Sequence, residues 1–196
     1  MHDSTTALRL IIQMRFPRTF IFVDLSGFTN FTETNGDRRA TKLLGEFRAV
    51  ARAVASEQGV RIDKYLGDGL MAVAVEQLDG ITFALELARR AETACAPLQL
   101  RIGIDTGDTM LFEGDDYIGS APNLASRLCD ESANLGVLMP TDHIEELPEG
   151  VSATPHGALN LHGFNNEVEV SVLSGRPVIA ERNDTSEIWT RQPFIG

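Results

Sequence analysis

Two aspartates stand where predicted strands give way to turns that contain glycine. Asp24 comes three residues before Gly27, and Asp68 lies between Gly67 and Gly69. Carboxylates with so little side-chain bulk around them suit Mg²⁺, which prefers one or two protein carboxylates and takes water and phosphate oxygens as its other ligands. Taken alone, each aspartate is better explained as a residue that caps a turn.

A lysine and a third aspartate have the hydrogen-bonding pattern that recognises adenine. Adenine presents a ring-nitrogen acceptor beside an exocyclic amino donor, and guanine presents the reverse pair on the same edge. Lys64 only donates and an ionised Asp116 only accepts, so the pair complements adenine and mismatches guanine. Without further context, both residues would be read as solvated surface charges.

A third pair, Asn123 and Arg127, is spaced i, i+4 near the start of a predicted helix, so both side chains share one face of it. An arginine stabilises the charge on a phosphoryl group in transfer, and an asparagine can hold a sugar oxygen in line for attack. By themselves, the two also fit an exposed arginine and an asparagine near a helix N-cap. None of the three pairs is specific on its own.

The elements that must position these residues begin in the order strand, helix, strand, strand, helix, strand. This order predicts an α+β fold with a ferredoxin-like βαββαβ core, an antiparallel sheet with helices on one face. Short β-branched runs indicate the strands, and a 3.6-residue apolar period indicates the helices. The predicted elements are strand Arg18–Leu25, helix Asp37–Ser56, strands Val60–Tyr65 and Leu70–Val75, helix Gln77–Ala94 and strand Leu98–Ile104.

An additional αβ region is expected after this core. It comprises a short hairpin arm that ends near Asp115 and Asp116, a helix at Ala121–Ala133, and strands at Val137–Met139 and Val168–Leu173. We expect residues 1–17 to be an N-terminal segment or the remnant of a linker, residues 18–175 to be the domain that carries the chemistry, and residues 176–196 to be a polar tail.

Composition limits the partners and the compartment. The 196 residues suffice for one domain with a full core. The net charge of −11 argues against a nucleic-acid partner, because duplex binding depends on clustered Lys and Arg. Cys95 and Cys129 offer neither a disulfide framework nor a zinc site and are expected to face the core, which fits a cytoplasmic protein.

An apolar run near the N-terminus, Ala7–Phe16, is interrupted by charged residues and is too short to insert into a membrane. It is equally consistent with the tail of a helix that joins an upstream module and with a local docking segment. An upstream sensor or regulatory module is therefore a candidate partner.

Four segments together show that the chain resembles the class III adenylate and guanylate cyclase catalytic domain from about Phe20 to Leu173. The resemblance implies the class III cyclase fold and an adenylate cyclase that converts ATP to 3′,5′-cyclic AMP and pyrophosphate in intracellular signalling. It also implies two Mg²⁺ or Mn²⁺ ions per active site and a site built across a homodimer. The segments are FVDLSGFT (Phe22–Thr29), DKYLGDGLMAV (Asp63–Val73), RIGIDTG (Arg101–Gly107) and DDYIGSAPNLASRL (Asp115–Leu128).

The metal positions of this family match residues in the first two segments. The resemblance implies that Asp24 and Asp68 bind the metal ions, together with the backbone carbonyl of Leu25. The loop formed by Ser26, Gly27, Phe28 and Thr29 is expected to present backbone N–H groups to the substrate at the start of a helix.

The base and ribose positions match the other two pairs. By resemblance, Lys64 and Asp116 select the base, and Asn123 and Arg127 orient the ribose and stabilise the transition state. In the family, one subunit supplies the metal-binding aspartates and the other supplies the remaining four residues. Lys64 and Asp68 would then serve different sites although they are four residues apart.

Three positions depart from the family pattern. Asp105 stands where relatives often carry His, Pro122 where a Val usually precedes the Asn, and His162 where many relatives have a Lys or Arg that contacts the triphosphate. Two other functions remain open, a catalytically silent nucleotide-binding regulatory module and a guanylate cyclase. The filled catalytic positions argue against the first, and the pair of Lys64 with Asp116 argues against the second.

Overall fold

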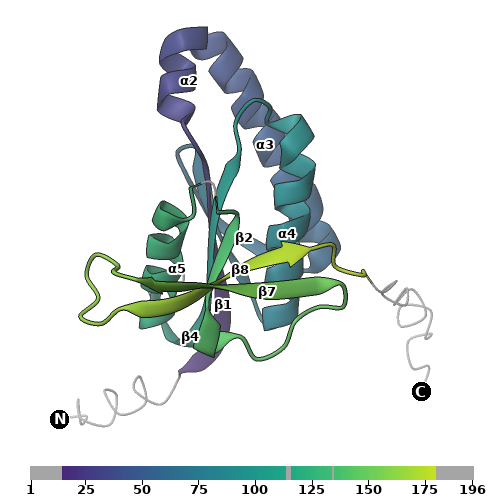
Figure 1. Cartoon of the computed structure of the whole chain (residues 1–196). Coiled ribbons are helices and arrows are strands. Elements are labelled where there is room, and N and C mark those ends of the chain that lie inside the picture. Colours follow the sequence, from purple (N-terminus) through teal and green to yellow (C-terminus); the bar gives the residue numbers. More distant parts are fainter. Residues whose placement is uncertain (1–14, 114–115, 134, 180–196) are drawn as a thin grey trace, which may run out of the picture.

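A mixed sheet of eight strands forms the centre of the molecule (Figure 1). This computed structural model describes residues 15–113, 116–133 and 135–179 of the chain. Seven strands follow the order β2-β3-β1-β4-β6-β8-β7, and β5 pairs with β4 off this path. The strands are β1 Phe16–Leu25, β2 Arg61–Leu66, β3 Gly69–Ala74, β4 Leu100–Phe112, β5 Asp116–Ile118, β6 Val137–Pro140, β7 Val151–Leu159 and β8 Val168–Gly175.

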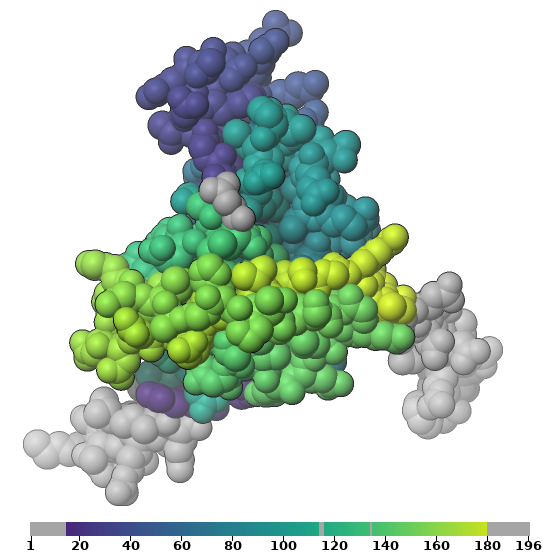
Figure 2. Space-filling view, in the orientation of Figure 1, coloured from purple at the N-terminus to yellow at the C-terminus, as the bar shows by residue number. Residues whose placement is uncertain are grey.

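Helices lie on both sides of the sheet. In Figure 1, α3 and α4 pack on one face, and α5 lies on the other. α2 has no buried residues, and Figure 2 shows it projecting beyond the body of the molecule together with the start of α3. The helices are α2 Phe28–Asn35, α3 Asp37–Gln58, α4 Gln77–Ala94 and α5 Ser120–Glu131, with a short 3₁₀ turn, η1, at Thr141–His143.

Packing of the long helices follows from their sequence. α3 buries Leu43, Phe47, Ala51 and Val54, whose spacing of three or four residues gives one apolar stripe against the sheet. On the opposite face, a Cβ at Gly103 in β4 would collide with the backbone of α5. The glycine therefore lets α5 lie close to the strands that carry the candidate site.

The predicted ferredoxin-like core is confirmed. Its four strands follow the order β2-β3-β1-β4 and are antiparallel, with α3 and α4 on one face. The C-terminal region adds β6, β8 and β7 to the edge at β4. Because β6 runs parallel to β4, the complete sheet is mixed.

Strand β7 was not expected, α2 was expected only as a helix of unstated length after the Ser26–Thr29 loop, and β4 is much longer than predicted. α2 is rich in Thr and Asn and packs only Phe28 and Phe31 against the core, so its apolar period is too short to give a signal. In β7, Pro155 and Gly157 flank a register shift, which breaks the alternation typical of a strand. The strand predicted at Leu98–Ile104 is wrong at both ends, because β4 begins at Leu100 and continues through polar residues to Phe112.

Some expectations fall outside the described residues. They are the run from Ala7 to Met14, the end of the arm at Asp115, and the tail from residue 180 onward. In the part of the chain that the structure describes, no helix is both long and apolar enough to cross a membrane. Cys95 and Cys129 are both buried and unpaired with each other, as expected.

Candidate active site

The two candidate metal-binding aspartates lie side by side at one end of the central strands. Asp24 is near the end of β1, and Asp68 is in the turn between β2 and β3. Val23 pairs with Leu70, which brings the start of β3 against Asp24. A Cβ at Gly69 would collide with the carbonyl of Val23 and would lie 3.2 Å from Oδ1 of Asp24. Only a glycine at position 69 lets the start of β3 lie this close to Val23 and Asp24.

The charge of Asp24 acts on Asp68. Burial raises the pKa of Asp68 above its usual value, and the neighbouring charge of Asp24 raises it further. A divalent cation bound beside Asp68 would offset this unfavourable charge.

An arginine that the sequence interpretation missed lies against Asp24. Arg101 is directly opposite Asp24 in the antiparallel pair of β1 and β4. Its Nε donates to Oδ2 of Asp24 at 3.1 Å, and its Nη2 contacts the same oxygen. The hydrogen bond to Asp24 raises the pKa of Arg101. Cross-strand pairing of opposite charges was the available signal, but it requires the register of β1 against β4.

These side chains border a hollow of about 200 Å³ between the strands and α5. Asp24, Gly69 and Arg101 line it from the sheet, and Cys129 and Asp130 line it from the helix. Burial raises the pKa of Cys129 to about 12, so this residue remains a thiol beside the site.

The proposed base-selecting residues are brought together although 52 residues separate them. Lys64 lies in β2 and Asp116 begins β5, and Nζ of Lys64 donates to Oδ1 of Asp116 at 2.9 Å. The lysine side chain is 37% exposed and the aspartate 66%, so both can reach a ligand from the same side. A hydrogen-bond donor and an acceptor therefore stand next to each other.

Asn123 and Arg127 are both exposed on α5. Nδ2 of Asn123 donates to the carbonyl of Gly119, and Nη1 of Arg127 lies 3.2 Å from Oδ2 of Asp130. Neither side chain is among those that line the hollow beside Asp24. The printed contacts of both side chains are thus with residues at or near their own helix.

The loop expected to receive the triphosphate leads from β1 into α2. Gly27 adopts a left-handed conformation with φ of 78°, which favours glycine, and its carbonyl accepts a hydrogen bond from the N–H of Phe31. Ser26 is tied to the sheet through its N–H, which donates to the carbonyl of Gln99. The first turn of α2 thus follows Asp24 within a few residues.

The residues that depart from the family pattern occupy different settings. His162 is exposed between β7 and β8 and does not line the hollow. Asp105 is 1% exposed, and Nδ1 of His143 in η1 lies 2.6 Å from its Oδ1. Gln77 at the start of α4 donates to the carbonyl of His143 and accepts from the N–H of Glu145. The Asp105 position is therefore part of a buried polar network.

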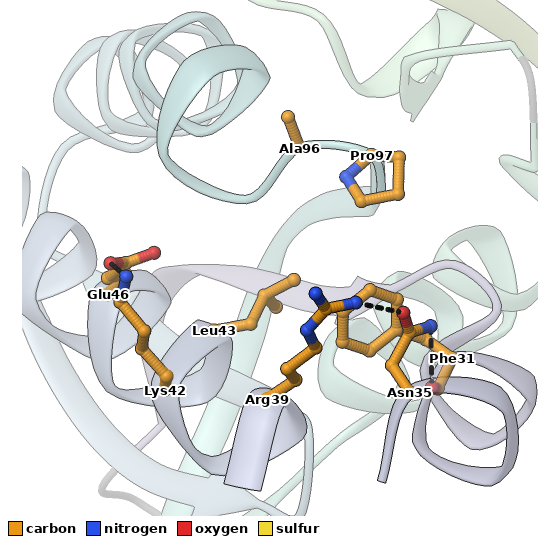
Figure 3. Close-up of a pocket in the computed structure, with 8 residues that line it drawn as sticks. All are labelled: Phe31, Asn35, Arg39, Lys42, Leu43, Glu46, Ala96 and Pro97. Carbon is orange, nitrogen blue, oxygen red and sulfur yellow. Dashed lines mark hydrogen bonds and ion pairs between the residues drawn. The ribbon is translucent and has the colours of Figure 1, made fainter.

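A second hollow, of about 340 Å³, lies between α2, α3 and the loop before β4 (Figure 3). Polar contacts lie at its border: Arg39 of α3 donates to Asn35 of α2 at 3.1 Å, and Lys42 lies 3.7 Å from Glu46 along α3. None of the predicted site residues lines it, so it is separate from the candidate site.

Asp24 and Asp68 fit a divalent cation that is bound together with substrate. Among the described residues, no group of three or more His, Cys, Asp or Glu is arranged to hold a metal ion. Mg²⁺ does not require such a group, because one or two carboxylates suffice when substrate and water provide the other oxygens. The donors are hard oxygens with an excess of negative charge, as this ion prefers.

Comparison with known proteins gives a sequence match over most of the chain. The profile of the adenylate and guanylate cyclase catalytic domain matches residues 15–175. An uncharacterised protein of Mycobacterium tuberculosis is 33% identical over 156 residues, which are 80% of this chain and 41% of that protein. A Streptomyces coelicolor protein named adenylate cyclase is 31% identical over 126 residues, 64% of this chain and 33% of that protein. The chain thus spans less than half the length of these relatives.

The fold also matches solved structures. The adenylyl cyclase CyaB from P. aeruginosa superposes with a TM-score of 0.71 and 24% identity, over 86% of this chain and 97% of that chain. At this identity the likeness shows a shared fold.

Proposed function

Because this chain belongs to the adenylate and guanylate cyclase catalytic domain family, we propose that it is an adenylate cyclase that converts ATP to 3′,5′-cyclic AMP and pyrophosphate. The observation that carries the choice of ATP is the contact of Lys64 Nζ with Asp116 Oδ1 at 2.9 Å. The lysine donates to the ring nitrogen of adenine, and the aspartate accepts from its amino group. Guanine would place a donor against the lysine and an acceptor against the aspartate, and leaving these groups unpaired is costly.

The catalytic groups act on the ribose and the phosphates. Asp24 and Asp68, with the carbonyl of Leu25, would hold two Mg²⁺ or Mn²⁺ ions, which lower the pKa of the ribose 3′-hydroxyl and neutralise the departing pyrophosphate. Asn123 orients the ribose so that its 3′-oxygen is in line with the α-phosphorus. Arg127 donates to the phosphoryl oxygens as charge develops on them.

Binding of the triphosphate falls to the loop that leads into α2. Gly27, Phe28 and Thr29 place backbone N–H groups at the first turn of that helix, where such groups have no partner within the helix, and the hydrogen bond from Ser26 to Gln99 holds the loop in place. Arg101, which already binds a carboxylate in this hollow, adds a guanidinium that suits phosphate oxygens equally well.

The active unit is a homodimer with two shared sites. Asn123 and Arg127 lie exposed on α5 and do not line the hollow beside Asp24 of their own chain, which supports their supply by a second copy. The arm formed by β4 and β5 exposes Leu111, Phe112 and Ile118, each close to half accessible, which supports burial of this arm against a partner. Two-fold symmetry then completes two equivalent sites.

The relatives suggest which segments and modules flank the domain. We infer that residues 18–175 form the catalytic domain, with residues 1–17 as a linker and 176–196 as a tail. The matching region makes up 41% of the length of the M. tuberculosis relative, which fits the presence of an upstream sensor or regulatory module. Its place of action would be the cytoplasm, where ATP is available.

Cyclic nucleotide formation tests this function. The purified chain should form cyclic AMP from ATP with Mn²⁺ and much less cyclic GMP from GTP. Asp24→Ala or Asp68→Ala should abolish nearly all turnover, whereas Asp108→Asn, an exposed carboxylate on β4, should leave it near the parent rate. A parent protein that prefers GTP would overturn the choice of substrate, and one that forms neither product would support a silent nucleotide-binding module.

A further inference from the structure

Strand β2 contains an irregularity next to the proposed base-selecting lysine. Ile62 pairs with Ala72 and Lys64 with Met71, so adjacent residues of β3 oppose residues of β2 that are two apart. Asp63 is therefore the extra residue of a β-bulge. A bulge changes the direction of the side chains beside it and is common next to functional sites.

The bulge buries a carboxylate. The side chain of Asp63 is 1% exposed, although it lies in an edge strand of the sheet. Among the described residues, neither of its oxygens accepts a hydrogen bond of good geometry. Two cations lie at ion-pair distance instead: Nη2 of Arg61 is 3.0 Å from Oδ1, and Nζ of Lys64 is 3.6 Å from Oδ2. Removing a carboxylate from water is unfavourable, and nearby cations such as these offset the desolvation penalty.

Lys64 thus lies between two carboxylates that differ in their surroundings. Asp116 belongs to the three-residue strand β5 and is 66% exposed, whereas Asp63 is enclosed. When Asp116 accepts a hydrogen bond from the amino group of a base, the carboxylate interacts with both the base and Lys64, and its attraction for Lys64 weakens. Asp63 is enclosed, so a base bound at Asp116 would leave its attraction for Nζ of Lys64 in place.

We propose that Asp63 is a positioning residue that fixes Lys64 for reading the base and so contributes to the preference for adenine over guanine. This role rests on the proposed adenylate cyclase activity. Asp63 does not itself touch the nucleotide; it acts through Lys64. Removing its charge should therefore affect recognition of the base more than the chemical step.

The test compares Asp63→Asn with Asp63→Glu and Arg61→Gln. We expect Asp63→Asn to raise KM for ATP about tenfold with kcat changed less than about threefold, and to lower the ratio of kcat/KM for ATP over GTP about tenfold. Asp63→Glu, which keeps the charge, should recover much of this ratio. Arg61→Gln removes the other cation beside Asp63 but keeps the contact of Asp63 with Lys64, so KM for ATP should stay near the parent value. A tenfold rise in KM in this variant would show that Asp63 acts on the fold and not through Lys64.

A double-mutant cycle separates action through Lys64 from a general structural effect. In the Lys64→Ala background, Asp63→Asn should add no further loss of ATP preference. Asp63→Asn could melt below the assay temperature. In that case the double variant Arg61→Gln/Asp63→Asn, which removes the buried carboxylate and its exposed partner together, replaces it in the kinetic comparison and in the double-mutant cycle.

The outcomes distinguish this role from the proposed function. An active parent whose folded Asp63→Asn variant keeps the parent KM and ATP preference would overturn the role of Asp63 alone. An equal loss in the Lys64→Ala background would overturn it as well. A parent that forms no cyclic nucleotide would overturn the proposed function and the role of Asp63 with it.

Discussion

Arg101 lies directly opposite Asp24 across β1 and β4, and its guanidinium binds Oδ2 of the Asp24 carboxylate through Nε and Nη2. The carboxylate that we assign to metal binding is therefore paired with a cation of its own chain. A divalent cation at Asp24 competes with this pair, because the same oxygen is the natural ligand for both.

This competition leads to a prediction about metal-induced stability. We expect Mn²⁺ to raise the melting temperature of Arg101→Gln by more than it raises that of the parent, because the ion no longer displaces a guanidinium. Without the ion, Arg101→Gln should melt below the parent, since Asp24 and Asp68 then repel each other without compensation. Thermal melts with EDTA and with Mn²⁺ measure both effects.

Arg39→Gln is the matched control, because Arg39 is an exposed arginine that is hydrogen-bonded to Asn35. Equal metal-induced shifts in Arg101→Gln and the parent would show that Arg101 does not compete for the metal site.

A second prediction concerns the base pocket. Lys64→Glu combined with Asp116→Cys should lower kcat/KM for ATP by at least about a hundredfold, because the polar edge of adenine loses both partners. Some use of GTP can appear but is not required. Lys42→Glu with Glu46→Cys makes the same two substitutions in an exposed ion pair and should leave the rates near the parent values. Parent-like rates for both nucleotides in the first variant would place the base pocket elsewhere.

A third prediction concerns the dependence of stability on pH. Burial raises the pKa of Asp105 to about 6, although its contact with His143 opposes this rise. Burial lowers the pKa of His143, but the hydrogen bond and charge of Asp105 raise it more, so the net change is upward. Both groups hold a proton more tightly in the folded chain than in the unfolded one. Their contribution to stability is therefore present at low pH and is lost as pH rises through the folded pKa values.

The Asp105→Asn variant isolates this contribution. Relative to the variant, the parent should lose stability as pH rises from about 4, near the unfolded pKa of Asp, to above the raised pKa of His143. Chemical denaturation of both proteins at several pH values measures the difference. Asp108→Asn removes an exposed carboxylate of the same strand that does not affect the pKa of Asp105 or His143, so it serves as the control. If the two curves of unfolding free energy against pH run parallel, the pair does not titrate as described.

Sequence patterns predicted the core of the fold well, because its elements carry strong periodicity. α3 buries residues at three- and four-residue spacing, and β1 and β3 are apolar runs closed by glycine turns. The bounds of α2 and the whole of β7 were not predicted, because neither element has such a period. α2 buries no side chain, and β7 accommodates Pro155 and Gly157 through a register shift that no local pattern announces.

The candidate site was predicted in part. Lys64 and Asp116 were paired because the chain resembles the cyclase family, and the structure places the two side chains in contact. Arg101 was missed because its role depends on the register of β1 against β4, which spacing along the chain does not reveal. Asp63 was missed because a bulge, not the alternation of β2, determines where its side chain goes.

The shared site gives the most direct test of this account. Asp24→Ala removes a metal ligand and Arg127→Ala removes the cation that we assign to the transition state, so each homodimer should be inactive. In a mixed dimer, one site carries both defects and the other carries neither. Random pairing makes about half of the dimers mixed, with one intact site of two, so the mixture should recover roughly a quarter of the parent rate of cyclic AMP formation. A mixture that stays inactive although subunit exchange has been demonstrated would contradict the shared site, as would full activity in a dilute sample shown to be monomeric.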